Sequence, residues 1–156
     1  MTTRVYLVED DPLKAKVISG FMAERFPDLS LDFYCSFHSG LKAIENNTPD
    51  LVLLDMTLPT YDRAPGEREG RLRPLGGYEL LSKIRLRAIK TKVIVITGLI
   101  SFGDGAQRIT FAEINSRCIA EFPGLFTGMV YYQQSDLDWC DDLARFVREI
   151  IGGDLC

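Results

Sequence analysis

The chain has 156 residues, a length that suits one folded domain, and its 46% hydrophobic and 26% charged residues exclude a disordered polymer. Its net charge of −4 gives the whole surface no general attraction for nucleic acid or anionic lipid. No apolar run approaches the roughly 18 residues of a membrane span, and the first residues carry charge where a signal peptide needs an apolar stretch, so we expect a cytoplasmic protein without direct nucleic-acid or membrane binding.

Strand-like and helix-like patterns alternate along the chain. The strand patterns are short apolar runs over residues 4–9, 31–37, 50–55, 92–98 and 128–132. The helix patterns place apolar residues three or four positions apart, over residues 11–26, 39–47, 78–89, 110–122 and 137–151. Because parallel strands need crossover connections, this order predicts an α/β fold: a single doubly wound five-stranded parallel sheet with helices on both faces.

The first helix pattern contains Pro12 near its start, a residue suited to the first helical position. Its apolar residues predict a core-facing side made of Leu13, Val17, Phe21 and Met22. In the last helix pattern, Trp139 recurs at helical spacing with Leu143, Phe146 and Val147 and is expected in the core.

Helix starts are predicted from capping residues. Ser39 is expected to open the second helix. Thr110 and Glu113 fit a capping box at the start of the fourth, and Ser135 with Asp138 is a candidate box before the fifth.

Two connections are longer than this fold class usually needs. Residues 60–77 form a Pro- and Gly-rich insertion that carries four arginines, Arg63, Arg68, Arg71 and Arg73. Residues 99–109 form the second long connection. Both follow strands at their carboxyl ends, the edge at which open α/β sheets bind ligands.

Polar residues follow the strands at that same edge. Glu9 and Asp10 come after the first strand, Asp55 after the third and Thr97 at the end of the fourth. Carboxylates brought together repel at roughly 1–4 kcal/mol per pair, so the site needs a proton or a cation. Oxygen ligands with room for water suit Mg²⁺, and a carboxylate beside such a metal can attack phosphorus.

Four segments, VYLVEDDP, DLVLLDMTLP, GGYELLSKIR and VIVITG, resemble in this order the receiver domain of two-component response regulators, the CheY-like family. The resemblance covers almost the whole chain and implies a flavodoxin-like sheet with strand order 2-1-3-4-5. It implies that Asp55 is the phosphoacceptor, Thr97 the hydroxyl switch residue and Tyr131 the switch aromatic.

The resemblance also implies a Mg²⁺ site. Its ligands would be Asp10, Asp55 and the carbonyl of Thr57, with Glu9 acting through water.

The sequence departs from this family at the end of the fifth strand. Receivers carry a lysine there that pairs with the acceptor carboxylate and then with the phosphoryl group, whereas this chain reads YYQQSD. Gln134 stands at that position, or Gln133 if the count slips by one residue. Glutamine supplies a hydrogen bond but no charge, and an arginine of the 60–77 insertion is one candidate for the missing positive charge.

The leading hypothesis is a stand-alone receiver, one domain over 1–156 without an output domain. It would accept a phosphoryl group from a sensor histidine kinase or phosphotransfer protein and act on a downstream protein by contact. As a signalling domain it would catalyse at most its own phosphorylation and dephosphorylation. Association into a homodimer is left open.

Two alternatives remain. The missing lysine favours a phosphorylation-independent pseudo-receiver that serves as an interaction module. A small phosphatase of the haloacid dehalogenase type also places a nucleophilic aspartate after an apolar strand. That chemistry wants a second acid two residues later, where this chain has Thr57.

Overall fold

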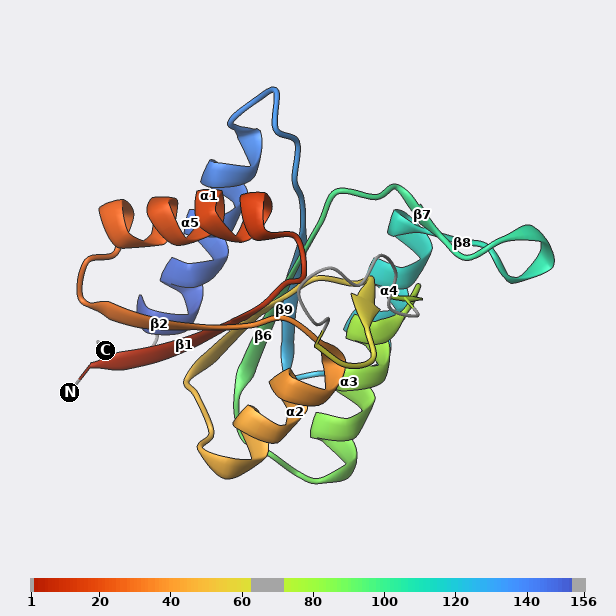
Figure 1. Ribbon diagram of the computed structural model, residues 1–156, viewed down its shortest axis with the longest axis horizontal. Coiled ribbons are helices and arrows are strands. Elements are labelled where there is room, and N and C mark those ends of the chain that lie inside the picture. The colour runs from red at the N-terminus through yellow and green to blue at the C-terminus, as the bar shows by residue number, and fades with distance from the viewer. Residues whose placement is uncertain (1, 63–71, 153–156) are drawn as a thin grey trace.

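Five parallel strands form the centre of the computed structural model, which describes residues 2–62 and 72–152. Their order across the sheet is β2-β1-β3-β6-β9, which confirms the predicted 2-1-3-4-5 arrangement (Figure 1). The bounds are Leu29–Tyr34 (β2), Thr3–Val8 (β1), Leu51–Leu54 (β3), Lys92–Thr97 (β6) and Phe126–Tyr131 (β9). Every neighbouring pair in this sheet is parallel.

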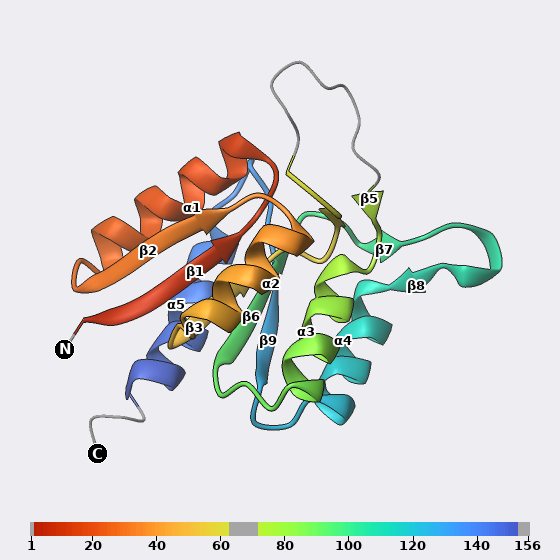
Figure 2. The same ribbon diagram turned by 60° about the horizontal axis from the view of Figure 1, so that its bottom comes forward.

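Helices cover both faces of the sheet, as predicted (Figures 1 and 2). Two helices, α1 (Pro12–Arg25) and α5 (Asp138–Gly152), pack on one face. The other face is covered by α2 (Phe37–Asn46), α3 (Gly76–Leu86) and α4 (Phe111–Glu121). Within residues 2–62 and 72–152, none of these helices is both long and apolar enough to cross a lipid bilayer.

The central strand β3 shows why the strand sequences do not alternate between apolar and polar residues. Val52 and Leu54 pack into the cluster under α2, α3 and α4, whereas Leu51 and Leu53 pack into the cluster under α1 and α5. All four side chains are fully buried. A strand buried on both faces has no position for a polar side chain until it leaves the sheet, and Asp55 is the first residue beyond it.

The core-facing side of α1 differs from the predicted one. Leu13 and Val17 are 55% and 37% exposed, and the buried residues are Lys14, Ala15, Ile18 and Met22. Of the predicted face only Met22 is fully in the core. Positions 14, 18 and 22 are spaced four apart and lie on one side of the helix, and this buried side includes a lysine.

The predicted first helical residue Pro12 is confirmed, because α1 begins there, whereas of the three predicted capping residues one is confirmed. Thr110 and Glu113 form the reciprocal capping box of α4. Ser36, rather than Ser39, caps α2, and Ser39 occupies the third helical position of that box. The prediction for Ser135 is wrong, because α5 begins at Asp138, whose N–H donates to Asp136 Oδ1 at 3.1 Å.

Both long connections take part in short antiparallel ribbons that the sequence patterns did not predict. Leu58–Pro59 (β4), just before the first connection, pairs with Leu72–Arg73 (β5) within it. In the second, Ser101–Phe102 (β7) pairs with Ile109–Thr110 (β8) around a short 3₁₀ turn, and this ribbon projects beyond the helices in both views (Figures 1 and 2).

Candidate functional site

Three carboxylates meet at the carboxyl edge of the sheet. Oxygen atoms of Glu9, Asp10 and Asp55 all lie within 4.8 Å of one another. The convergence follows from strand register, because Val8 of β1 is paired with Leu54 of β3 and the acids are the next residues on each strand. The predicted gathering of acids from two separate stretches is therefore present.

The backbone at Asp55 is fixed from both sides. Its N–H donates to the carbonyl of Val8 at 3.0 Å, and the N–H of Gly77 at the start of α3 donates to the carbonyl of Met56 at 2.8 Å. A β-carbon at position 77 would lie 2.6 Å from the carbonyl oxygen of Asp55. Only glycine allows α3 to approach the end of β3 this closely, so Gly77 helps to place the carboxylate.

A lysine that the sequence analysis did not single out occupies the centre of the site. Lys14, in the first turn of α1, is only 7% exposed. Its Nζ lies 2.6 Å from Glu9 Oε1, 2.9 Å from the carbonyl oxygen of Ile96 and 3.4 Å from Asp55 Oδ1. These three acceptors match the three hydrogens of an ammonium group.

Lys14 could have been found from the helical spacing. It lies four residues before Ile18 and eight before Met22, so a core-facing side that contains both isoleucine and methionine must also contain the lysine. A lysine on the buried side of a helix needs an anionic partner. Acids that could serve, Glu9 and Asp10, directly follow the preceding strand in the sequence.

The charges of the site are out of balance. Burial, and then the charge of Asp55, raise the pKa of Glu9 to about 7, against the opposing effect of Lys14. Burial likewise raises the pKa of Asp55, and the Lys14 ammonium again opposes this shift. Among the described residues, the Lys14 ammonium faces both Glu9 and Asp55, and its single positive charge does not balance these two carboxylates when both are ionised. An all-oxygen donor set with this excess of negative charge fits Mg²⁺.

Thr97 and Tyr131 end neighbouring strands and are register partners. Thr97 is fully buried, and its Oγ1 accepts a hydrogen bond from the N–H of Leu99 at 3.2 Å. Tyr131 is 36% exposed, and its ring lies edge-to-face with Phe111 at the start of α4, with 6.2 Å between ring centroids. Paired residues of parallel strands point to the same face, so both side chains face the helices α2, α3 and α4.

The two glutamines after β9 lie at the surface. Gln133 and Gln134 are both exposed, and Gln133 Nε2 lies 3.5 Å from the hydroxyl of Tyr131. The side chain there that faces the acidic cluster is Tyr132, whose ring centroid is 5.7 Å from Lys14 Nζ. Tyr132 also packs on Trp139 of α5, with 5.2 Å between ring centroids.

The remaining predicted residues lie around the insertion. The hydroxyl of Thr57 donates to the carbonyl of Pro74 at 2.9 Å, and the role of its own carbonyl in metal binding stays a prediction. Arg73 Nη1 donates a hydrogen bond to Glu79 Oε2 at 2.7 Å, and the guanidinium lies over the ring of Phe37. Arg73 therefore does not supply the positive charge that the missing lysine would bring to Asp55. The other three arginines of the insertion, Arg63, Arg68 and Arg71, lie outside the described residues.

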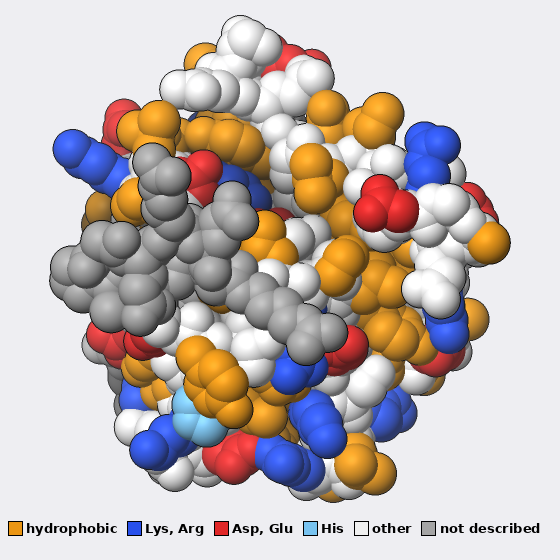
Figure 3. All heavy atoms as spheres, turned by 45° about the vertical axis from the view of Figure 1, so that its right-hand side comes forward, with side chains coloured by type: hydrophobic (Ala, Val, Ile, Leu, Met, Phe, Trp, Pro, Cys, Tyr) orange, Lys and Arg blue, Asp and Glu red, His pale blue; other side chains and the backbone are white. Residues whose placement is uncertain are grey.

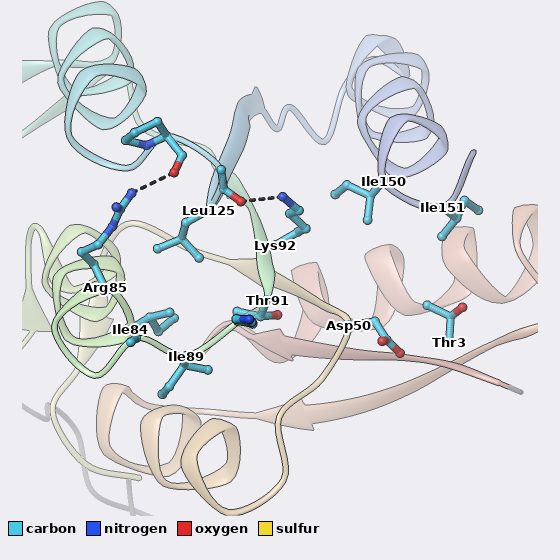
Figure 4. Close-up of a pocket in the computed structure, with 14 residues that line it drawn as sticks. Thr3, Asp50, Ile84, Arg85, Ile89, Thr91, Lys92, Leu125, Ile150 and Ile151 are labelled. Atoms are coloured by element: carbon cyan, nitrogen blue, oxygen red, sulfur yellow. Dashed lines mark hydrogen bonds between the residues drawn. The ribbon is translucent and has the colours of Figure 1, made fainter. Parts of the chain in front are cut away.

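A cavity of about 640 Å³ lies at the opposite edge of the sheet (Figure 4). It is lined by residues at or next to the strand starts, including Thr3, Asp50 and Lys92. The cations Arg85 and Lys92 already donate to the carbonyls of Pro123 and Gly124. Volume alone does not make this cavity the functional site, because ligands of open α/β sheets bind beyond the carboxyl ends of the strands.

Comparison with known proteins gives relatives of about the same length. No protein-family model matches the chain. The uncharacterised protein y4jR of Sinorhizobium fredii is 31% identical over 139 residues, which cover 87% of this chain and 91% of that protein. The Detocs response regulatory protein DtcB of Enterobacter cloacae is 30% identical over 150 residues, which cover 94% of this chain and 99% of that protein.

Solved receiver domains share the fold at lower identity. The CheY-like receiver domain protein of Methanospirillum hungatei superimposes with a TM-score of 0.63 at 18% identity, over 99% of this chain and 98% of that one. The receiver domain of the Francisella response regulator 1452 gives a TM-score of 0.57 at 18% identity, over 96% of both chains. By its fold and by its similarity to a named regulator over nearly the full length of both proteins, the chain belongs to the response regulator receiver family.

Proposed function

We propose that this protein is a phosphorylatable receiver in which Asp55 accepts the phosphoryl group with the help of Mg²⁺. The observation that carries the proposal is the cluster of Glu9, Asp10 and Asp55, whose oxygens lie within 4.8 Å of one another around a buried lysine. Such a cluster disfavours folding, so its presence at the ligand-binding edge of the sheet favours a chemical role.

The phosphodonor in this proposal is the phosphohistidine of a sensor histidine kinase or phosphotransfer protein, the partner that the family implies. An oxygen of Asp55 attacks phosphorus, the bond from phosphorus to the imidazole nitrogen breaks, and the electron pair leaves with the imidazole. The product is an acyl phosphate on Asp55. Mg²⁺, held by Asp10, Asp55, the carbonyl of Thr57 and, through water, Glu9, would neutralise charge on the phosphoryl oxygens.

The signal would leave by protein contact. The Thr97 hydroxyl, at the end of the strand next to β3, would turn toward a phosphoryl oxygen, and Tyr131 would move with it because the two are register partners. Exposed apolar side chains lie nearby on the connection after β6 and on α4, among them Leu99, Ile100 and Ile119. The side of the molecule shown in Figure 3 carries hydrophobic side chains at its surface, which suits a downstream protein partner.

The phosphorylation-independent module is the weaker alternative. Its main support was the missing positive charge beside the acceptor, and the Lys14 ammonium 3.4 Å from Asp55 Oδ1 supplies such a charge. The phosphatase alternative is set aside because the chain belongs to the receiver family.

The proposal is tested with acetyl phosphate and Mg²⁺. We expect the intact mass to increase by one phosphoryl group, and hydroxylamine, which cleaves acyl phosphates, to release that group as phosphate and leave the hydroxamate of Asp55. The matched control is Asp55→Asn, which keeps the shape of the side chain but has no nucleophilic carboxylate. If neither acetyl phosphate nor the phosphoryl mimic beryllofluoride modifies or binds the wild-type protein in Mg²⁺, the interaction module replaces the receiver.

A further inference from the structure

We propose that Lys14 on α1 binds the transferred phosphoryl group, in the role that receivers give to a lysine at the end of the fifth strand. The inference rests on the proposed function of Asp55 as the phosphoacceptor. It adds Lys14 and helix α1 to the site, because α1 rather than the end of β9 would then supply the positive charge that holds the phosphoryl group.

The burial of Lys14 is the first argument. A lysine ammonium that is only 7% exposed needs oxygen partners, since burial of an unpaired charge is strongly unfavourable. Lys14 finds them on three different strands or strand ends: Glu9 after β1, Asp55 after β3 and Ile96 in β6. Its charge is therefore held at the junction of the strands where phosphoryl transfer would occur.

The unequal lengths of these contacts are the second argument. Nζ lies 2.6 Å from Glu9 Oε1 and 2.9 Å from the Ile96 carbonyl, which is enough to hold the ammonium in place. The contact with Asp55 Oδ1 is the longest, at 3.4 Å. A phosphoryl oxygen on Asp55 can replace this weakest contact while the other two persist, so Lys14 is preorganised for the product.

The end of β9 offers the third argument. Tyr132 turns its ring toward Lys14 and packs on Trp139, while Gln133 and Gln134 are exposed. An aromatic ring beside the ammonium excludes water from it and attracts its charge. In this chain the end of β9 thus contributes an aromatic ring that lines the site, and α1 contributes the positive charge.

The backbone of α1 is anchored at the same point. Asp11 caps the helix, and its Oδ1 accepts hydrogen bonds from the N–H groups of Leu13 and Lys14 at 3.0 and 3.4 Å. The lysine therefore stands on a capped first turn directly connected to the acids of β1. A change in its contacts on phosphorylation would be felt by the first turn of α1.

The test measures two affinities separately for the full chain. Beryllofluoride binding in saturating Mg²⁺ is followed by the fluorescence of Trp139, which packs on Tyr132 beside the lysine. Mg²⁺ binding alone is followed by calorimetry. The variants are Lys14→Met, which preserves most of the side-chain volume, and Lys14→Gln, which keeps a hydrogen-bond donor without charge. Lys16→Gln is the matched control, because Lys16 lies exposed on the same helix and its loss changes the net charge equally.

We expect both Lys14 variants to bind beryllofluoride about tenfold or more weakly, the size of a lost charge-assisted hydrogen bond, and to accept phosphoryl groups from acetyl phosphate more slowly. Their Mg²⁺ affinity should be unchanged or higher, because a neighbouring positive charge has been removed. In the wild type and in Lys16→Gln, beryllofluoride should slow amide hydrogen exchange in residues 13–18. This protection should be absent from folded Lys14→Met and Lys14→Gln.

Beryllofluoride binding by folded Lys14→Met or Lys14→Gln that equals the wild type would overturn the inference. A wild-type protein that neither accepts phosphate nor binds beryllofluoride marks a different failure, that of the proposed function itself, and the inference falls with it.

Discussion

Glu9, Asp10 and Asp55 hold carboxylate oxygens within 4.8 Å of one another, a spacing at which like charges repel by roughly 1–4 kcal/mol per pair. Lys14 relieves part of this repulsion through its contacts with Glu9 and Asp55. The pKa of each of these two acids is nevertheless raised, with burial as the leading cause. At the residue scale, the site is therefore unfavourable for folding in the absence of a divalent cation.

This imbalance predicts that Asp55→Asn stabilises the metal-free protein at neutral pH. A raised pKa means that the ionised form of Asp55 is less favourable in the folded state than in the unfolded state, and the neutral amide removes that penalty. We expect the free energy of unfolding to increase by about 1 kcal/mol, measured by urea denaturation in EDTA. Asp28→Asn, at an exposed turn residue, should change stability by less, and a destabilised Asp55→Asn would contradict the explanation.

At the scale of the element, the start of α3 sets the position of Asp55. A β-carbon at Gly77 would lie 2.6 Å from the Asp55 carbonyl oxygen and 2.9 Å from the Met56 α-carbon. Both neighbours are backbone atoms that cannot rotate away. The helix α3 and the end of β3 must therefore shift together if position 77 gains a side chain.

Gly77→Ala is accordingly expected to lower the free energy of unfolding by about 1–3 kcal/mol and to weaken beryllofluoride binding. Gly20→Ala in α1 is the matched control, because no atom lies within 4 Å of the added β-carbon there. Since glycine inside a helix is unfavourable, this control should gain up to about 1 kcal/mol. Urea denaturation of both variants checks the pair, and equal behaviour would show that the close approach at Gly77 is not restrictive.

At the scale of the whole molecule, the acidic cluster connects segments far apart in the sequence. Glu9 and Asp10 follow β1, Asp55 follows β3, and Lys14 brings in α1 and, through the Ile96 carbonyl, β6. A cation bound there joins these segments only when the sheet is formed. Metal binding should therefore act on global stability rather than on one loop.

We predict that Mg²⁺ raises the melting temperature of the wild-type protein. At a concentration one hundred times the dissociation constant, linkage gives about 2.7 kcal/mol, and each kcal/mol corresponds to about 2–4 °C for a domain of this size. Differential scanning calorimetry in Mg²⁺ and in EDTA measures the shift. Asp10→Asn, which removes one charge of the cluster, should show a smaller shift, and an equal shift would place the metal elsewhere.

Much of the architecture could be predicted from the chain alone. The alternation of apolar runs and helical patterns was sufficient for five parallel strands with helices on both faces, because strand and helix periods are local properties. The acids at the ends of the first and third strands could be assigned to one edge for the same reason, since parallel strands end together. The capping box at Thr110 and Glu113 is local as well, and it was predicted correctly.

The predictions failed where contacts between residues distant in sequence decide which side chains are buried and which segments pair. Leu13 and Val17 look like core residues, but the approach of the sheet to α1 buries Lys14 and Ile18 instead. The β4–β5 and β7–β8 ribbons depend on pairing between segments whose own patterns are too short to read as strands.

The sequence by itself determined the order of the strands and helices, the edge at which the acids gather and the lack of a lysine after the fifth strand. Only the tertiary structure decided that a positive charge nonetheless lies beside Glu9 and Asp55, and that it comes from Lys14 on α1. The reason is physical: a side chain acquires its partners from the rotation of its helix against the sheet, and packing of the whole core sets that rotation.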